Sequence, residues 1–258
     1  MFKRAFLVLI GLFVGHLRAL SADEIDQIGK KIWQNEASGR EDLLVFWNPN
    51  EPFPSLGIGH NIWSPVGHNS VYTQDFTHLC NYFKKHGVTL PNWLEVAKET
   101  GAPWQSREDF YKDTIRLEQL KKLLVDTIPL QAEFMIDRMI RKMPEIVEAA
   151  PIRHRKKVIK NIELLRASSL GNYVLVDYLN FKGDGLNSKE VAGGQPWGLL
   201  AVLLDMPNNL NAKNVTKAFA VSAAKKLLNR IEKSPDYKDI TFMHGWMKRI
   251  STYTDFKN

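Results

Sequence analysis

Hydrophobic positions recur at helical spacing along most of this chain. Between residues 22 and 39, Ile25, Ile28 and Ile32 follow one another at three or four residues, which places them on one face of a helix. Glu36 falls in the last turn of this helix, and Gly39 is a typical helix stop. The same spacing predicts further helices over residues 76–86, 107–127, 129–143, 152–166, 173–181, 197–205 and 215–232, with 173–181 buried.

One short region has a different pattern. Residues 53–62 alternate well enough to predict a small strand, and a turn with two prolines precedes them at residues 48–52. We find no internal repeat, low-complexity linker or shift in composition. The pattern therefore predicts a mainly α-helical α+β fold, organised as a single domain over residues 23–258 with a small β-hairpin.

Residues 1–22 have the composition of a secretory signal peptide. A basic start precedes an apolar run over residues 5–15, and small residues follow it. The run is shorter than the 20 or so apolar residues that span a bilayer. Cleavage near Ser21 or Ala22 is one interpretation, and an uncleaved N-terminal anchor is the other. Both place the working part outside the cytoplasm, so we predict a periplasmic or secreted protein.

Cysteine content and net charge indicate the compartment in which the protein works and the kind of partner it binds. Cys80 is the only cysteine, so the chain forms no internal disulfide, which favours a bacterial periplasm over an animal's extracellular space. Loss of Lys3, Arg4 and Arg18 with the signal lowers the formal charge from +7 to +4. This favours cell-wall polymers and lipid headgroups as partners. We find no nucleic-acid motif, and the basic run at 153–157 is predicted to be a solvated helix face.

The strongest functional signal lies between Glu36 and His60. Glu36 is followed by a polar, Pro-rich loop and then by Ser-Leu-Gly-Ile-Gly-His at residues 55–60. This arrangement resembles the phage-type lysozymes, in which a catalytic Glu precedes a hairpin ending in T-[IV]-G-[YI]-G-H. The resemblance implies a lysozyme-like fold with its hairpin beside the cleft, and glycoside hydrolysis with Glu36 as general acid. Ser55 replaces the Thr and would hold a water molecule, while His60 would brace the hairpin beside the substrate.

The second carboxylate departs from that family's pattern. An Asp follows an aromatic residue in the lysozyme hairpin, but here Asn48 stands near that position, and an amide cannot act as a base. We therefore count Asn48 among substrate-binding residues and Glu51 as the candidate base. A one-carboxyl route, as in lytic transglycosylases, is the alternative mechanism.

A second group of polar residues surrounds glycines in the C-terminal half. Asp177, Asn180 and Lys182 precede Gly183, and Trp197 follows a second glycine turn. Polar side chains and aromatic faces around such turns are typical of saccharide subsites, so we predict substrate binding here. A buried hydrogen-bonded network is the alternative. The segment also resembles uncharacterised secreted bacterial proteins that carry D-Y-x-N-F-K-G-[ED]-G together with the first motif, which indicates a shared architecture and site only.

Several other classes of site have no support in the sequence. There is no H-E-x-x-H, Cys/His cluster, G-x-S-x-G or phosphate-binding loop, so we expect no metal and no cofactor.

We predict a monomeric, exported glycosidase that cleaves bacterial peptidoglycan. The alternatives are a chitosanase-like hydrolase of another amino-sugar polymer and a non-catalytic cell-wall-binding protein.

Overall fold

The computed structural model describes residues 19–68 and 74–255, and the predicted signal peptide falls mostly on residues 1–18, outside these ranges. The chain divides into two compact units. The N-terminal unit is Ile25–Met135, and the C-terminal unit is Ile136–Asn258 together with Met1–Glu24. Helices predominate in both and the strands are short, which confirms the predicted mainly helical α+β class. The single-domain organisation over residues 23–258 stays a prediction.

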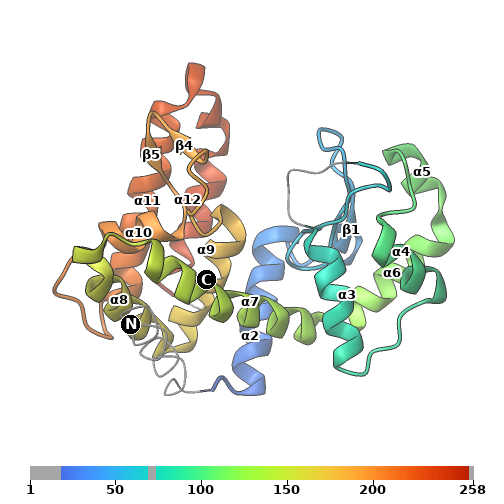
Figure 1. The fold of residues 1–258 in the computed structure, drawn as a ribbon, viewed down its shortest axis with the longest axis horizontal. Coiled ribbons are helices and arrows are strands. Elements are labelled where there is room, and N and C mark those ends of the chain that lie inside the picture. The colour runs from blue at the N-terminus through green and yellow to red at the C-terminus, as the bar shows by residue number, and fades with distance from the viewer. Residues whose placement is uncertain (1–18, 69–73, 256–258) are drawn as a thin grey trace, which may run out of the picture. The chain divides into compact units, whose positions relative to one another are not determined.

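The N-terminal unit packs helices around a three-stranded antiparallel sheet of order β1-β2-β3 (Figure 1). Its elements are α2 (Ala22–Ala37), η1 (Glu41–Leu44), β1 (Val45–Phe46), β2 (Ser55–Leu56), β3 (Asn61–Ile62), α3 (Asp75–Lys85), α4 (Asn92–Thr100), α5 (Arg107–Lys112), α6 (Thr114–Asp126) and the first part of α7 (Ile128–Ala149). The single strand predicted over residues 53–62 is two strands instead. Gly57 and His60, both at positive φ, reverse the chain between β2 and β3.

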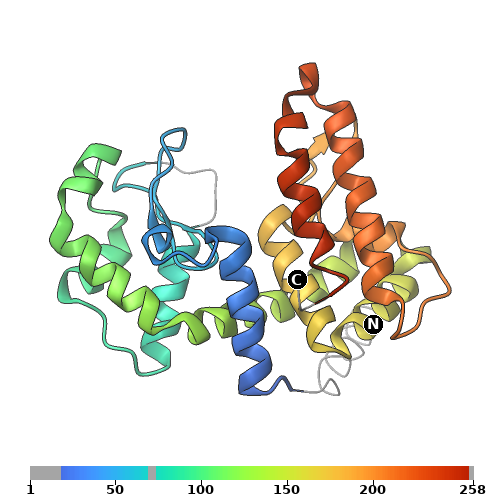
Figure 2. The same cartoon turned by 180° about the vertical axis from the view of Figure 1, so that it is seen from behind.

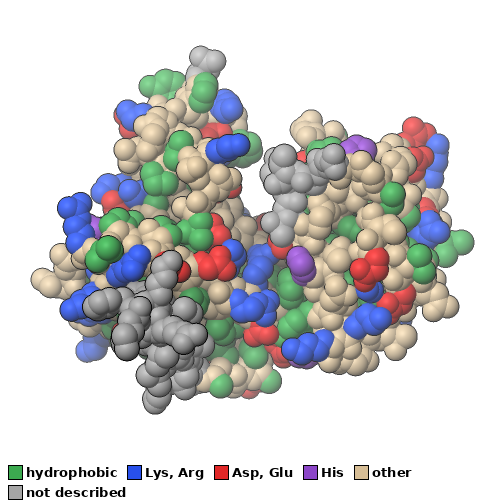
Figure 3. All heavy atoms as spheres, in the orientation of Figure 1, with side chains coloured by type: hydrophobic (Ala, Val, Ile, Leu, Met, Phe, Trp, Pro, Cys, Tyr) green, Lys and Arg blue, Asp and Glu red, His purple; other side chains and the backbone are tan. Residues whose placement is uncertain are grey.

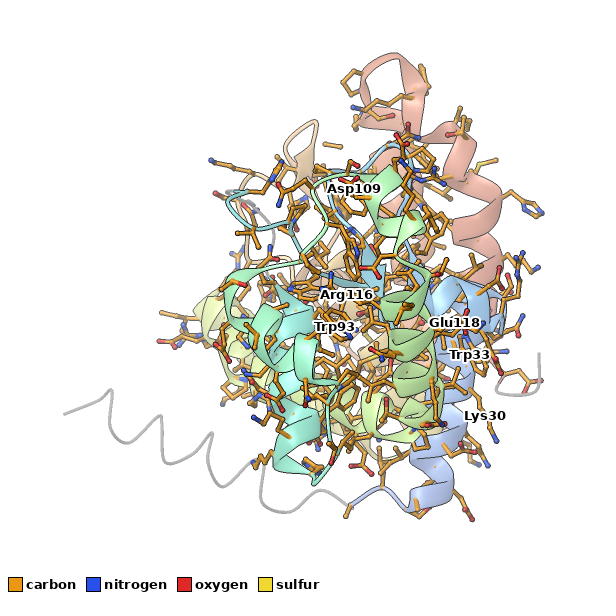
Figure 4. The ribbon with its side chains drawn as sticks, turned by 90° about the vertical axis from the view of Figure 1, so that its right-hand side faces the viewer. Lys30, Trp33, Trp93, Asp109, Arg116 and Glu118 are labelled. Atoms are coloured by element: carbon orange, nitrogen blue, oxygen red, sulfur yellow. The ribbon has the colours of Figure 1, made fainter. Side chains whose placement is uncertain are left out.

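Aromatic side chains fill much of the N-terminal core. The ring of Trp104 lies 5.9 Å from that of Trp63 and 4.9 Å from that of Phe110, both edge-on. Near the surface, the Arg116 guanidinium lies 5.4 Å from the ring of Trp93, and the two residues are close to each other in Figure 4. Since each aromatic side chain buries on the order of 150–250 Å², this cluster supplies much of the unit's apolar core.

The C-terminal unit is a helical bundle with one small hairpin. Its elements are the remainder of α7, η2 (Ile152–His154), α8 (Arg155–Arg166), α9 (Ser169–Lys182), β4 (Val191–Ala192), β5 (Gln195–Pro196), α10 (Leu199–Asp205), α11 (Val215–Lys233), η3 (Pro235–Phe242) and α12 (Met243–Ser251). Helix α9 is buried from Gly171 to Leu179, which confirms the predicted buried helix. Helices α11 and α12 lie side by side as an arm, with η3 joining them at its end (Figures 1 and 2).

None of the helices within the described ranges combines the length and apolar character that a bilayer span requires.

Candidate functional site

Glu36 is held at a rigid helix end. On α2, Ile28 and Ile32 are fully buried, which fixes the helix against the core of the N-terminal unit. The helix ends one residue after Glu36, where the backbone N–H of Gly39, at a φ of 68°, donates to the Trp33 carbonyl. The Glu36 side chain is 13% exposed. Its carboxyl group is therefore accessible, yet largely removed from bulk water.

The turn at residues 57–60 brings His60 to Glu36. His60 Nδ1 lies 3.7 Å from Glu36 Oε2, and His60 adopts a left-handed backbone with a φ of 48°. The side chain that fixes the turn is Gln131 on α7, whose Oε1 accepts a hydrogen bond of 2.9 Å from Ile58 N. Gln131 thus provides the bracing that the sequence assigned to His60, and the imidazole faces a carboxyl group instead.

Glu51 is the second carboxyl group on which the charge of this imidazole acts. Burial raises the pKa of Glu51 above its usual value, and the neighbouring His60 opposes that rise. The backbone at Glu51 is fixed because Trp47 Nε1 donates to the Glu51 carbonyl at 2.8 Å. His60 therefore acts on both candidate carboxyl groups, at 3.7 Å from Glu36 and through its charge on Glu51.

The remaining two predicted residues of this segment occupy the sheet and its loop. Ser55 is buried in β2, where it pairs with Phe46 of β1. Asn48 Oδ1 accepts a hydrogen bond of 3.0 Å from the Asn50 backbone, so its amide shapes the loop that leads to Glu51. Ser55 and Asn48 thus contribute to the architecture of the site, and their contact with substrate stays a prediction.

Helix α5 holds the start of the loop at Trp47. The Tyr111 hydroxyl accepts a hydrogen bond of 3.1 Å from Trp47 N, and Arg107 Nε donates to the Trp47 carbonyl at 2.8 Å. These two residues and Gln131 are separated from their partners by 60 to 73 residues of sequence. Sequence reasoning missed all three, because no local pattern indicates such long-range contacts.

Asp177 lies in the C-terminal unit and is fully buried. Both of its oxygens accept hydrogen bonds of 2.8 Å from the Arg249 guanidinium, and the Tyr253 hydroxyl donates to Oδ2 at 2.6 Å. Burial, followed by the Asp177 charge, raises the pKa of Tyr253 far above its usual value. This geometry favours the buried-network alternative for Asp177 over substrate binding.

The other three predicted residues of this segment have protein partners. Asn180 Oδ1 accepts a hydrogen bond of 2.7 Å from Arg138 Nη2. Lys182 Nζ lies 3.6 Å from the centre of the Trp246 ring, and the Arg230 guanidinium lies 4.1 Å from that of Trp197. Lys182 and Trp197 thus belong to a cation–aromatic cluster. The predicted residues thus divide between two units, and the candidate carboxyl groups Glu36 and Glu51 lie in the N-terminal unit.

A surface cavity of about 490 Å³ lies elsewhere in the N-terminal unit, where Trp63, His78 and Lys98 contribute to its lining, and Glu36 is not part of it.

No family model, curated protein or solved structure matches the chain. Its function must therefore be inferred from the site itself.

Proposed function

We propose that this protein is an exported glycoside hydrolase that cleaves the glycan of bacterial peptidoglycan, with Glu36 as general acid. The observation that carries the proposal is a single imidazole that acts on two carboxyl groups. Glu36 approaches His60 at 3.7 Å, and Glu51 interacts with the same ring. Glycoside cleavage needs a proton donor and a second group that activates water or stabilises positive charge, and a pair of carboxyl groups usually supplies both.

The proposed reaction divides the work between the two carboxyl groups. Protonated Glu36 gives its proton to the glycosidic oxygen as the bond from that oxygen to the anomeric carbon breaks. A water molecule attacks the anomeric carbon and gives its proton to ionised Glu51. Because burial raises the pKa of Glu51, this base is fully ionised only above the usual pH range of a glutamate. His60 opposes that rise and extends the active range downward.

Replacing the proton donor tests the proposal. We expect Glu36→Gln to abolish release of soluble muropeptides from purified peptidoglycan, while the thermal midpoint changes little because shape and volume are kept. Glu41→Gln is the matched control, since Glu41 is an exposed glutamate five residues along the chain. Full activity in Glu36→Gln would overturn the assignment.

A non-catalytic cell-wall-binding protein is the second candidate, and Asn48 favours it. Asn48 stands near the position where the lysozyme pattern has a carboxylate, and its amide oxygen accepts a hydrogen bond from the Asn50 backbone. Retention on insoluble peptidoglycan without soluble products after long incubation would support this alternative. Products from chitosan, with none from peptidoglycan, would instead indicate a chitosanase-like hydrolase.

A further inference from the structure

The end of the arm in the C-terminal unit carries an exposed apolar surface. Tyr237, Ile240, Phe242 and Met243, which we call the arm-end patch, are between 38% and 60% exposed. Across the part of the chain that the structure describes, twelve large apolar side chains are exposed. Four of them lie within the seven positions from 237 to 243. Single exposed apolar residues are ordinary, but a contiguous group marks an interaction surface.

The patch is supported by a rigid base. The ring of Phe242 stacks on that of Trp246, with 5.8 Å between centroids and an angle of 11°. Trp246 is buried and lies 3.6 Å from Lys182 Nζ and 5.0 Å from the Arg230 guanidinium. Arg230 Nε also donates to Asp239 of η3 at 2.9 Å. These contacts hold Phe242 in place on a fixed base, which lowers the entropic cost of binding through it.

Basic side chains accompany the patch. Lys233, Lys238 and Lys248 are exposed and stand before, within and after it along the chain. Residues 230–249 contain five Lys or Arg against three Asp or Glu, a net charge of +2. Figure 3 shows apolar and basic side chains together toward the end of the arm.

We infer that the arm-end patch docks on the surface of an anionic phospholipid bilayer. Tyr and Phe favour the level of the headgroups, and nearby lysines are attracted to lipid phosphates. The aliphatic members Ile240 and Met243 favour lipid over a glycan, which stacks on aromatic faces. Four side chains that are about half exposed also fall far short of the roughly 800 Å² per partner that a stable dimer buries. This inference is independent of the proposed hydrolase activity.

A local probe in the full chain tests the inference. Ile240→Cys would be labelled with an environment-sensitive dye, while Cys80 stays unlabelled because it is fully buried and burial raises its pKa to about 12. The control is Ile152→Cys on η2, where Ile152 is 82% exposed beside the basic residues Arg153 and Arg155. Both labelled chains would be titrated with vesicles of phosphatidylcholine, with and without phosphatidylglycerol.

The expected result is specific to position and to lipid charge. The probe at residue 240 should shift to the blue with vesicles that contain phosphatidylglycerol and be quenched by brominated lipid, while the probe at residue 152 stays unchanged. Adding Phe242→Ser should weaken this response about tenfold. An absent response, or an equal one at both positions, would overturn the inference. So would a response to purified peptidoglycan alone, which indicates a glycan, or to protein concentration alone, which indicates a second copy of the chain.

Discussion

Two polar segments of this protein contain similar residues and use them differently. At Glu36, an imidazole nitrogen of His60 lies 3.7 Å from the carboxyl group, and the side chain is 13% exposed. Around Asp177, three hydrogen bonds of 2.6 to 2.8 Å come from Arg249 and Tyr253, and no surface remains. A fully buried carboxylate whose oxygens accept hydrogen bonds from arginine and tyrosine has a structural role, whereas one at a helix end that keeps some exposure is available for chemistry.

The largest effect on stability should come from Asp177→Asn. This change leaves the buried Arg249 guanidinium without its counter-charge, so we expect a loss of about 3–5 kcal/mol in the free energy of unfolding. Urea denaturation measures it. The control is Glu118→Gln, which removes an exposed carboxylate 3.5 Å from Lys121 and should cost less than about 1 kcal/mol. Equal losses in the two variants would contradict the difference drawn between buried and exposed carboxylates.

Gly57→Ala should have the next largest effect and should act on the site. Gly57 has a φ of 74°, and an added Cβ would lie 2.3 Å from Gln131 Oε1, the group that fixes the turn. We expect a loss of about 1–3 kcal/mol and reduced activity, because the turn that carries His60 must move. Gly87→Ala is the matched control, with a φ of 79° and open space around the added carbon. If both variants lose the same stability and keep activity, Gln131 does not hold the turn.

Glu51→Gln addresses the second carboxyl group. If Glu51 is the base, activity on peptidoglycan should fall at least about tenfold. Because folding raises the pKa of Glu51, its ionised form lowers stability above the usual glutamate range, and this cost disappears at lower pH. The variant should therefore melt slightly higher than the wild type at pH 7, with no gain near pH 4. Full activity would point to a one-carboxyl mechanism.

His60→Asn should give the smallest effect on activity and stability. The variant distinguishes an electrostatic role of His60 from a role in bracing the turn. His60 lowers the pKa of Glu51, so its removal should raise that pKa and shift the acidic limb of the activity profile to higher pH. Thermal stability should change little, because Gln131 holds the turn. The control His244→Asn, at an exposed position on α12, should leave the profile unchanged. An unshifted limb in His60→Asn would remove His60 from the electrostatics of the site.

Local patterns predicted most of the helices correctly, with instructive exceptions. The predicted helix over residues 129–143 stops before Pro144, but α7 continues to Ala149. Proline costs one backbone hydrogen bond, and the burial of Ile146 and Val147 beyond it offsets this loss. At residues 53–62, an apparent single strand is a hairpin, because alternation alone does not show where the chain reverses.

The sequence by itself determined the helical periodicity, the position of Glu36 at a helix end and the glycine turn that leads to His60. These features depend on neighbours a few residues apart, whose spacing can be read directly. Only the tertiary structure decided that Gln131 fixes the turn, that burial raises the pKa of Glu51 while His60 opposes the rise, and that Asp177 is enclosed by Arg249 and Tyr253. Most of these partners are more than 70 residues apart, and the burial that distinguishes an available carboxyl group from a structural one exists only in the folded chain.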